Sequence, residues 1–414
     1  MKVALFLYHF PVRSETFVIQ HAMALSRAGV DLTIITQKDC GGWENFDPRV
    51  AAELKDRIVV LPATDRPRWP VQLLRTLFSS SALKLLRLLL FSVLVGRRDI
   101  IRDLPVWTKM APIGRFDVIL AHFGPVGVLA MILRKAGYFE GPIATIFHGF
   151  DMSRRKVVRR YRKGYSKLFD LGELMLPISE LWRSRLLEWG APAEKIEVLH
   201  MGVDLPEDRP DYSREGNDPL RILSVGRLTR KKAHADVIEA VAGCKCPVEL
   251  DVIGAGEEEP RLRALARSIA GDRVNLLGPR PHKDVLKAFA EADVFILPSV
   301  TADDGEMEGI PLVLMEAMAA GTTVITTRHS GIPELVEHGV TGFLVDEHDP
   351  AAITNVVEGI LAGAYDLPAI REQAFERVRE DFYNPELNNR LLELLEGLAV
   401  RHSHDRTPVQ TTER

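Results

Sequence analysis

The fold is decided by the first stretch of the chain, residues 3–36, which reads VALFLYHFPVRSETFVIQHAMALSRAGVDLTIIT. Short apolar runs at Val3–Tyr8 and Asp31–Thr36 predict buried strands. Between them, apolar residues recur at helical spacing over Ser14–Ala28, with Ser14 as an N-cap and Gly29 as a stop. A strand, a helix and a second strand in this order predict a parallel sheet with both faces covered.

The same alternation continues and then starts again. Strands are predicted at Val118–Ala121, Ala144–Phe147, Arg221–Val225, Val248–Ile253, Val274–Leu277, Val294–Leu297 and Thr323–Thr326. Residues 206–219 are polar and rich in proline, which is typical of a linker. We therefore predict an α/β fold with two Rossmann-like domains, residues 1–205 and 220–400. Parallel sheets would face a central cleft, and the last helix could pack back on the first domain.

Composition excludes several classes of protein. The 414 residues carry a formal net charge of −4, which argues against a nucleic-acid partner. The three cysteines are too few and too scattered for a disulfide framework, and they indicate a reducing compartment. The N-terminus predicts a strand, not a signal peptide. Residues 81–96 are strongly apolar, but Lys84 and Arg87 interrupt them, so we expect a helix that is buried or lies on a membrane surface. The polar residues 401–414 predict a disordered tail.

A basic motif follows the first predicted strand of the second half. The strand ends, Gly226 turns the chain, and Arg227 and Lys232 follow. Arginine offers a planar fork and lysine a point charge, so the two can clamp a diphosphate at the mouth of a sheet. The alternative is a solvated, basic start of a helix.

An acidic motif follows the strand that ends at Leu297. The loop from Asp303 to Glu308 precedes Gly309, Ile310 and an apolar helix that carries Glu316. A charged residue on such a helix requires a partner. The hydroxyl groups of a sugar nucleotide would provide one, because carboxylates accept hydrogen bonds from them. The alternative is a buried ion pair.

Two further motifs follow strands. His148, Gly149 and Asp151 come directly after a strand of the first half, where a histidine is either structural or part of a site. Gly254 and Gly256 come after a strand of the second half. The third glycine of a dinucleotide site is missing there and three glutamates follow, so we expect close approach of the backbone to a ligand such as a nucleoside base.

Taken together, these motifs resemble the family-4 retaining glycosyltransferases of the GT-B fold. The family's two glutamates, with seven residues between them, correspond to Glu308 and Glu316. Its donor-phosphate cations correspond to Arg227 and Lys232. The chain also resembles a narrower group, the bacterial exopolysaccharide transferases of the colanic-acid and amylovoran type. The similarity is in residues 10–17, 148–151 and 301–305. The glycine pair of many relatives is absent from the first loop, so Ser14 and Thr16 would supply contacts there. Ala233 stands where a glycine often follows the lysine.

The resemblance implies a function. A nucleotide sugar, UDP-linked, would bind the second half and pass its sugar, with retention of configuration, to a polyprenyl-diphosphate-linked glycan. His148, Glu308, Arg227 and Lys232 would be the catalytic set. Donor contacts would come from Arg227, Lys232, Gly254, Gly256, Glu308, Gly309, Ile310 and Glu316, and acceptor contacts from Ser14, Thr16 and Asp151. Because two cations neutralise the leaving diphosphate, no metal and no cofactor beyond the donor are expected.

The basic run from Arg154 to Lys163 predicts contact with anionic lipid on the cytoplasmic face of the plasma membrane. A solvated helix is the alternative reading of this run. Two other functions stay open at this point: a GT-B nucleotide-sugar epimerase or hydrolase, and a protein that binds sugar nucleotides without catalysis.

Overall fold

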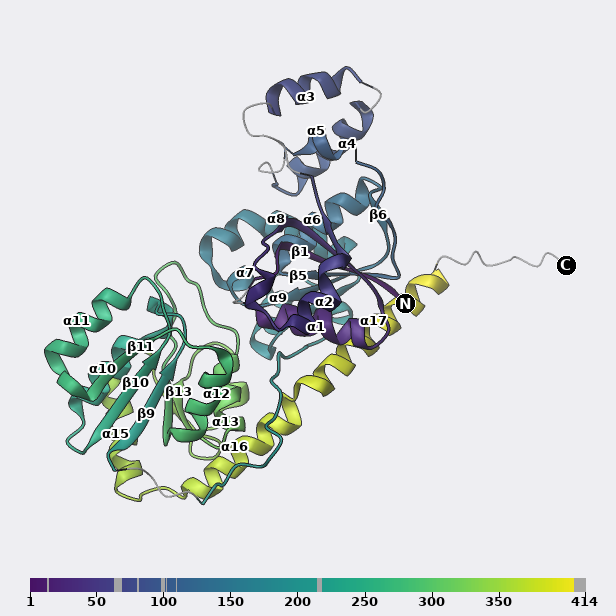
Figure 1. Cartoon of the computed structure of the whole chain (residues 1–414). Helices are drawn as coiled ribbons and strands as arrows, with labels where there is room; N and C mark the ends of the chain where they lie inside the picture. Colours follow the sequence, from purple (N-terminus) through teal and green to yellow (C-terminus); the bar gives the residue numbers. More distant parts are fainter. Residues whose placement is uncertain are drawn as a thin grey trace. The chain divides into compact units, whose positions relative to one another are not determined.

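A computed structural model describes residues 1–12, 15–62, 69–79, 82–97, 101, 103–108, 110–213 and 218–405. The chain forms two compact units (Figure 1). The first contains residues 1–178, 182–199 and 388–414, and the second contains residues 179–181 and 200–387. The chain therefore passes into the second unit at residue 200, slightly before the start of the linker predicted from composition.

The first unit is built on a six-stranded parallel sheet with the order β3-β2-β1-β5-β7-β8. Its strands are β1 (Lys2–Phe10), β2 (Asp31–Asp39), β3 (Ile58–Val60), β5 (Val118–His122), β7 (Ile143–Phe147) and β8 (Leu174–Pro177). A two-stranded sheet pairs β4 (Gly114–Arg115) with β6 (Phe139–Glu140). The helices are α1 (Thr16–Arg27), α2 (Pro48–Leu54), α3 (Trp69–Leu77), α4 (Ala82–Leu94), α5 (Leu104–Trp107), α6 (Gly124–Lys135), α7 (Phe150–Ser153), α8 (Arg155–Leu171) and α9 (Glu180–Glu188).

The second unit repeats this plan with the order β11-β10-β9-β12-β13-β14, again all parallel. The strands are β9 (Leu220–Val225), β10 (Val248–Ile253), β11 (Val274–Gly278), β12 (Val294–Leu297), β13 (Thr323–Thr327) and β14 (Phe343–Val345). The helices are α10 (His234–Gly243), α11 (Glu259–Ile269), α12 (His282–Glu291), α13 (Leu312–Ala319), α14 (Ile332–Leu335), α15 (Pro350–Leu361) and α16 (Leu367–Asp381). The last helix, α17 (Asn384–Asp405), begins in the second unit, and its residues from 388 onward belong to the first.

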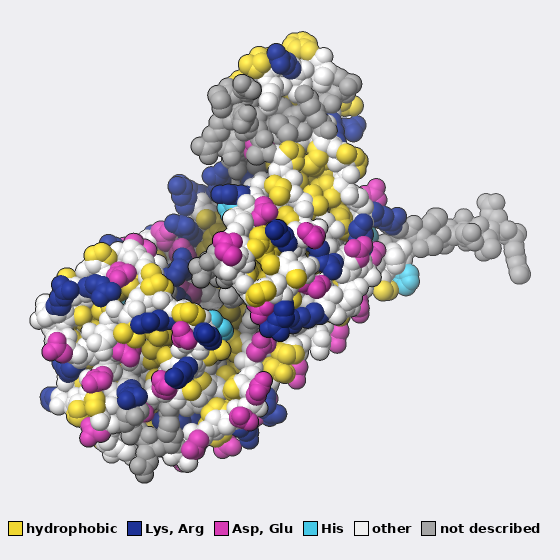
Figure 2. Space-filling view, in the orientation of Figure 1, with side chains coloured by type: hydrophobic (Ala, Val, Ile, Leu, Met, Phe, Trp, Pro, Cys, Tyr) yellow, Lys and Arg dark blue, Asp and Glu magenta, His cyan; other side chains and the backbone are white. Residues whose placement is uncertain are grey.

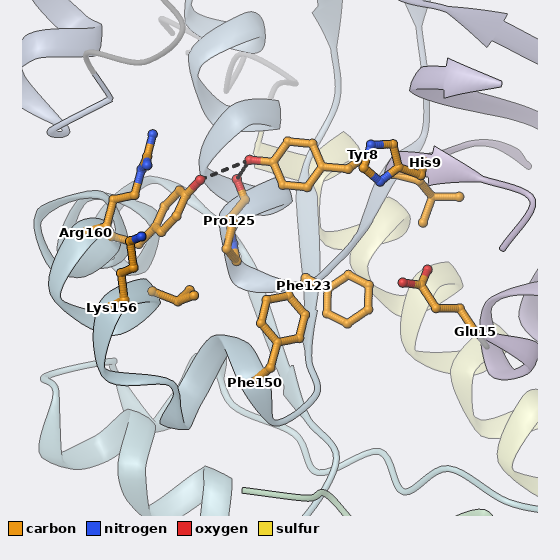
Figure 3. Close-up of a pocket in the computed structure, with 11 residues that line it drawn as sticks. Tyr8, His9, Glu15, Phe123, Pro125, Phe150, Lys156 and Arg160 are labelled. Atoms are coloured by element: carbon orange, nitrogen blue, oxygen red, sulfur yellow. Dashed lines mark hydrogen bonds between the residues drawn. The ribbon is translucent and has the colours of Figure 1, made fainter. Parts of the chain in front are cut away.

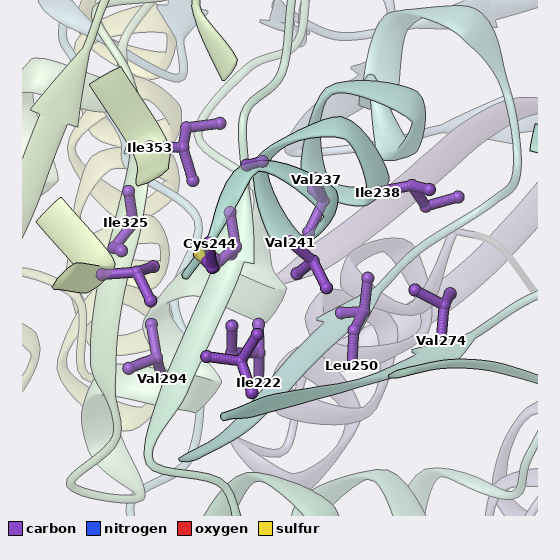
Figure 4. Close-up of a cluster of buried hydrophobic side chains, with 14 of the residues drawn as sticks. Ile222, Val237, Ile238, Val241, Cys244, Leu250, Val274, Val294, Ile325 and Ile353 are labelled. Atoms are coloured by element: carbon purple, nitrogen blue, oxygen red, sulfur yellow. The ribbon is translucent and has the colours of Figure 1, made fainter. Parts of the chain in front are cut away.

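Apolar side chains cover both faces of the second sheet. On one face, β-branched strand residues such as Ile222 and Val294 pack against Val237 and Val241 of α10 and Ile353 of α15 (Figure 4). A second cluster on the other face includes residues of α12, α13 and α16. Burial on both faces explains why these strands are nearly continuous apolar runs, since a parallel sheet exposes neither face to water.

Both sheets share one consequence for function. In each, the strand order reverses between two central strands, β1 and β5 in the first unit and β9 and β12 in the second. The loops that leave these strands at their carboxyl ends turn to opposite faces and leave a crevice, which is where open α/β sheets bind ligands. The architecture therefore places one candidate site in each unit.

The predicted strands are present, and none of their ends moves by more than three residues. Five strands were missed: β3, β4, β6, β8 and β14 have only two to four residues each, which is too short to establish a period. The helix predicted from Ser14 begins at Thr16, and Glu15 holds the N-cap position. The prediction of a tail from residue 401 was wrong for residues 401–405, because α17 continues through them to Asp405. Residues 406–414 lie outside the described part.

Candidate active site

The candidate site of the second unit lies at the carboxyl ends of β9 and β12. β9 leads into a turn at Gly226 and the short 3-10 helix η6 (Arg230–Lys232). β12 leads into the loop of residues 298–311, which ends at α13. The N–H of Val300 donates to the carbonyl of Lys231 at 2.8 Å, so the two loops are joined. The basic and the acidic motif thus meet at one edge of the sheet.

Glu308 lies between two lysines. Its Oε1 is 3.2 Å from Nζ of Lys231 and 3.3 Å from Nζ of Lys232, and its side chain is only 14% exposed. Burial raises the pKa of Glu308, but attraction to the two lysines is stronger and lowers the pKa to about 2. Glu308 is therefore ionised at neutral pH.

The two lysines respond differently to this environment. Burial lowers the pKa of Lys232, and its attraction to Glu308 offsets that effect only in part. Lys231 is also desolvated, but Glu308 and Glu306 together raise its pKa. The Lys231 Nζ lies 2.7 Å from Oε1 of Glu306. A further anion beside Lys232 would stabilise the charged form of that lysine.

Lys231 was missed by the sequence analysis. It and Arg230 bind the acidic loop, since Nη1 of Arg230 lies 3.0 Å from Oδ2 of Asp303. The sequence contains three consecutive cations at residues 230–232 and several acidic residues between 303 and 308. This charge complementarity could have indicated that the two segments pair. The acidic loop is thereby held to η6 by ion pairs at several points along its length.

The backbone of Glu308 is fixed by groups that the motifs did not indicate. Its N–H donates to Nε2 of His329 at 3.1 Å, and its carbonyl accepts from Oγ of Ser330 at 2.6 Å. On the other side of the ring, Nδ1 of His329 lies 2.6 Å from Oε1 of Glu347. Glu347 also accepts the N–H of Thr301 at 2.9 Å. These contacts hold both ends of the acidic loop to the segments that follow β13 and β14.

Glu316 has a protein partner in this structure. Its Oε1 lies 2.9 Å from Nε2 of His282, at the start of α12. This hydrogen bond raises the pKa of His282. This contact is an ion pair when His282 is protonated, but it is not a buried one, because the side chain of His282 is largely exposed and that of Glu316 is 15% exposed.

The remaining donor-side residues lie around this centre. Arg227 is exposed in the loop after β9. Gly309 is half-buried, whereas Ile310 packs into the apolar core with its side chain. Only the backbone of Ile310 is therefore placed to face a ligand.

The structure explains why residues 254 and 256 are glycines, and the explanation was not evident from the sequence. A Cβ at Gly254, where φ is +154°, would lie 1.9 Å from the carbonyl oxygen of Gly226. A Cβ at Gly256 would lie 2.3 Å from that of Leu228. The close approach predicted at these glycines is made by the loop after β9, and a ligand is not needed to explain it.

In the first unit, His148 follows β7 and is 7% exposed. Its ring packs against Phe17 of α1 and Phe123, with centroid separations of 4.6 and 4.5 Å. Nε2 of His148 lies 3.1 Å from Nδ1 of His122, the last residue of β5. Burial lowers the pKa of His148, so the ring is neutral at physiological pH.

Asp151 is fully buried and supports the backbone. Its oxygens accept the N–H groups of Gly124, His148 and Gly149 at 2.8, 3.0 and 2.9 Å. Asp151 thereby joins the loops after β5 and β7, and the predicted contact with an acceptor stays a prediction. Thr16 is exposed in the first turn of α1, and Ser14 lies outside the described residues.

A cavity of about 390 Å³ opens beside these loops (Figure 3). Phe123 and Phe150 form one wall, with ring centroids 5.0 Å apart. Lys156 and Arg160 of α8 lie on one side and Glu15 lies on the other. Burial raises the pKa of Glu15 to about 7. The other lining residues are Leu7, Tyr8, His9, Pro125, Val157 and Tyr161.

Comparison with known proteins divides the chain in the same way. Residues 14–207 match the family described as Glycosyltransferase Family 4, and residues 207–377 match Glycosyl transferases group 1. A colanic acid biosynthesis glycosyltransferase of Escherichia coli is 39% identical over 410 residues, which cover 96% of this chain and 100% of that protein. The amylovoran biosynthesis glycosyltransferase of Erwinia amylovora is 38% identical over 416 residues, with the same coverage.

Solved structures show the same fold. The HepE protein of Anabaena in complex with UDP-glucose superimposes with a TM-score of 0.67 at 18% identity, covering 96% of this chain and 100% of that one. The motifs that join Glu308 to Lys232 at the end of β9 thus occur within a GT-B architecture of two parallel-sheet units.

Proposed function

The chain belongs to the glycosyltransferase family of these colanic acid and amylovoran enzymes, and we propose that it transfers a sugar from a UDP-sugar to a lipid-linked glycan in exopolysaccharide biosynthesis. The observation that carries this proposal is the buried carboxylate of Glu308 between Lys231 and Lys232, at the switch point of the second sheet. A sugar supplies hydroxyl donors for Glu308, and a diphosphate supplies a second anion for Lys232, whose desolvation Glu308 offsets only in part.

Each side chain has a proposed role. Arg227 and Lys232 neutralise the charge that develops on the departing diphosphate, an effect that is strongest where water is excluded. Glu308 binds hydroxyl groups of the transferred sugar. Glu316 binds the ribose, exchanging its bond with His282 for bonds to the ribose hydroxyls. His148 orients the sugar against the acceptor.

We propose that configuration at the anomeric carbon is retained. The bond between that carbon and the diphosphate oxygen breaks, and a bond to the acceptor oxygen forms on the same face. The proton of the acceptor hydroxyl passes to the leaving phosphate oxygen. Because Arg227 and Lys232 supply positive charge, the reaction is proposed to proceed without a metal ion.

The cavity of the first unit suits the acceptor. Aromatic faces at Phe123 and Phe150 can stack on a sugar ring, and Lys156 and Arg160 can bind a phosphate group. A glycan on a polyprenyl diphosphate carries both groups. The same pair of contacts would be poorly matched to a free neutral sugar.

The surface of the first unit supports peripheral association with an anionic membrane. On α3 and α4, apolar side chains point to solvent, namely Val71, Leu74, Leu77, Leu83, Leu86, Leu90, Val93 and Leu94. They gather on the part of the first unit that carries these helices (Figure 2). Cations of α8 are exposed as well: Arg155, Lys156, Arg159, Arg160, Arg162 and Lys163. A Cβ added at Gly96, just after α4, would lie 3.8 Å from the backbone of α8, so the two surfaces adjoin.

Apolar side chains next to cations match the acyl chains and headgroups of an anionic leaflet. Among the described residues, no helix has the length and hydropathy needed to cross a bilayer. Vesicle flotation tests the proposal: Leu90→Glu with Leu94→Glu should abolish binding to anionic vesicles. Leu286→Glu, at another exposed leucine, on α12, should not. Equal binding of the wild type to neutral vesicles would contradict the role of the cations.

Turnover tests the transferase assignment. A panel of radiolabelled nucleotide sugars is incubated with a lipid extract in excess chelator, and the stereochemistry of the product is read by NMR. Arg227→Ala and Glu308→Gln should each lower transfer by roughly a hundredfold, whereas Arg221→Ala, at the opposite end of β9, should not. Epimerised or hydrolysed donor without product, or donor binding without turnover, would replace the proposal by one of the two alternative functions.

A further inference from the structure

Three histidines form a line beneath the wall of the first-unit cavity. Nδ1 of His21, on α1, lies 3.4 Å from Nε2 of His122, and Nδ1 of His122 lies 3.1 Å from Nε2 of His148. The residues are 4%, 0% and 7% exposed. They come from α1, from the end of β5 and from the loop after β7, so the fold brings together residues that are far apart in the sequence.

Apolar neighbours isolate this line. Phe17 lies over both His122 and His148, at centroid separations of 6.1 and 4.6 Å. Asp151 is a buried carboxylate three residues after His148, and its oxygens accept hydrogen bonds from backbone N–H groups. Burial lowers the pKa of all three rings, so each is neutral at physiological pH.

Neutral rings restrict the hydrogen bonding. A neutral imidazole has one N–H donor and one acceptor nitrogen. In each of the two nitrogen–nitrogen contacts, one nitrogen must therefore carry a proton and the other must not. If His148 donates from Nε2, His122 must accept at Nδ1, carry its proton on Nε2 and donate to His21. If His21 donates from Nδ1, His122 must accept at Nε2, donate from Nδ1, and leave His148 protonated on Nδ1. Every ring therefore has its proton on Nε2, or every ring has it on Nδ1.

We propose that His21 and His122 are positioning residues that set the tautomer of His148 through this chain. Nε2 of His148 is used in the contact with His122. Within the described part of the molecule, no group makes a hydrogen bond to Nδ1 of His148, so this nitrogen is available to a substrate. Because the three rings share one tautomer, the state of that nitrogen, donor or acceptor toward the sugar, is fixed together with the tautomers of His122 and His21. This role rests on the proposed contact of His148 with the transferred sugar.

The three rings can change from one shared tautomer to the other without a net gain or loss of protons. A proton taken up at Nδ1 of His148 is matched by transfer from its Nε2 to Nδ1 of His122. Transfer from Nε2 of His122 to Nδ1 of His21 follows, and one proton leaves Nε2 of His21. No oxidant, reductant or further reactant is needed.

The first test needs no variant. Two-bond ¹H–¹⁵N correlation spectra of the full chain, labelled with ¹⁵N-histidine, distinguish the two tautomers of each ring. All three histidines should show the same tautomer at pH 7.5. A mixed set, or a charged ring in the line, would overturn the proposal whether or not the protein is a transferase.

The second test uses a matched pair at His21. His21→Phe keeps a ring but can neither donate nor accept, so the His122 and His148 signals should shift and transfer should fall roughly tenfold or more, with donor KM unchanged. His21→Asn places an amide near the position of Nδ1, which can donate or accept, so the signals and most of the activity should return. Equal losses in both variants would show a merely structural role. If His148→Ala kept full transfer while the shared tautomer stood, the proposed role of His148 would fail and the chain would not.

Discussion

Glu308 has two cations on one carboxylate oxygen, and this links its protonation to folding. Its pKa in the folded protein, about 2, is below the ordinary value of 4.5. The ionised form is therefore favoured by folding. Its contribution to stability is fully present above pH 4.5 and is lost as the pH falls toward 2.

Glu308→Gln should accordingly lower the free energy of unfolding at pH 7. The difference from wild type should close between about pH 5 and pH 2, because the wild-type residue becomes neutral over that range. Urea unfolding at a series of pH values measures this directly. A difference that does not depend on pH would mean that the lysines do not recognise the charge. Leu361→Ala, at an exposed apolar position, serves as a control whose difference should not vary with pH.

Gly254 lies at a position where the backbone conformation and a neighbouring carbonyl group leave no room for a side chain. Any side chain there needs φ near +154° and meets the carbonyl oxygen of Gly226 at 1.9 Å. Gly254→Ala should destabilise the second unit by about 3 kcal/mol or more and weaken UDP binding, because the loop after β9 must move. Gly271→Ala is the control, since φ is +59° and nothing lies within 4 Å of its Cβ. Equal destabilisation of the two variants in urea would refute the packing argument.

At the scale of elements, α8 presents two neighbouring cations to the cavity. Lys156 and Arg160 are one turn apart on the helix, so both can reach one phosphate group. Alanine at either position should weaken binding of a short-chain polyprenyl-diphosphate sugar by about tenfold, and added salt should reduce the difference. Arg162→Ala, exposed on α8 but outside the cavity lining, should leave affinity unchanged. Calorimetry in detergent gives these affinities, and an equal loss with Arg162→Ala would point to a diffuse field instead of a site.

The sequence allowed the strand–helix alternation to be predicted because long apolar runs and helical spacing are local signals. β14, with the three residues Phe343–Val345, carried no such signal and is recognised only by its pairing with β13. Charged residues in motifs, such as Arg227 and Glu308, could be proposed as site residues from their sequence positions, and their roles stay predictions. His329 and Lys231 were not proposed, because their roles depend on which loops the fold brings together.

Asp151 shows a structural role that the sequence did not reveal. Its position after β7 placed it correctly at the carboxyl edge of the sheet, but position does not reveal the direction of a side chain. Its oxygens turn inward to three backbone N–H groups, which the loop needs in order to be buried. A residue can thus lie in a site and act only on the backbone that shapes it.

At the scale of the whole molecule, each unit should show slower hydrogen exchange only when its own ligand binds. UDP should slow hydrogen exchange in residues 226–232 and 298–316 of the second unit, where the cations and carboxylates lie. A polyprenyl-diphosphate sugar should slow exchange in residues 7–12 and 123–161 of the first. Mass-spectrometric exchange on the full chain reads both. Protection by UDP confined to the first unit would reverse the assignment of donor and acceptor sides.

Because each sheet has its own switch point, the enzyme has a modular construction. A gene that encoded the first unit of this chain and the second unit of a relative could change the sugar that is moved while keeping the molecule that receives it. The seam would have to respect α17, whose first four residues belong to the second unit and whose remainder belongs to the first. A long helix of this kind ties the ends of a recombined chain together, and it would limit the places where evolution can exchange the halves.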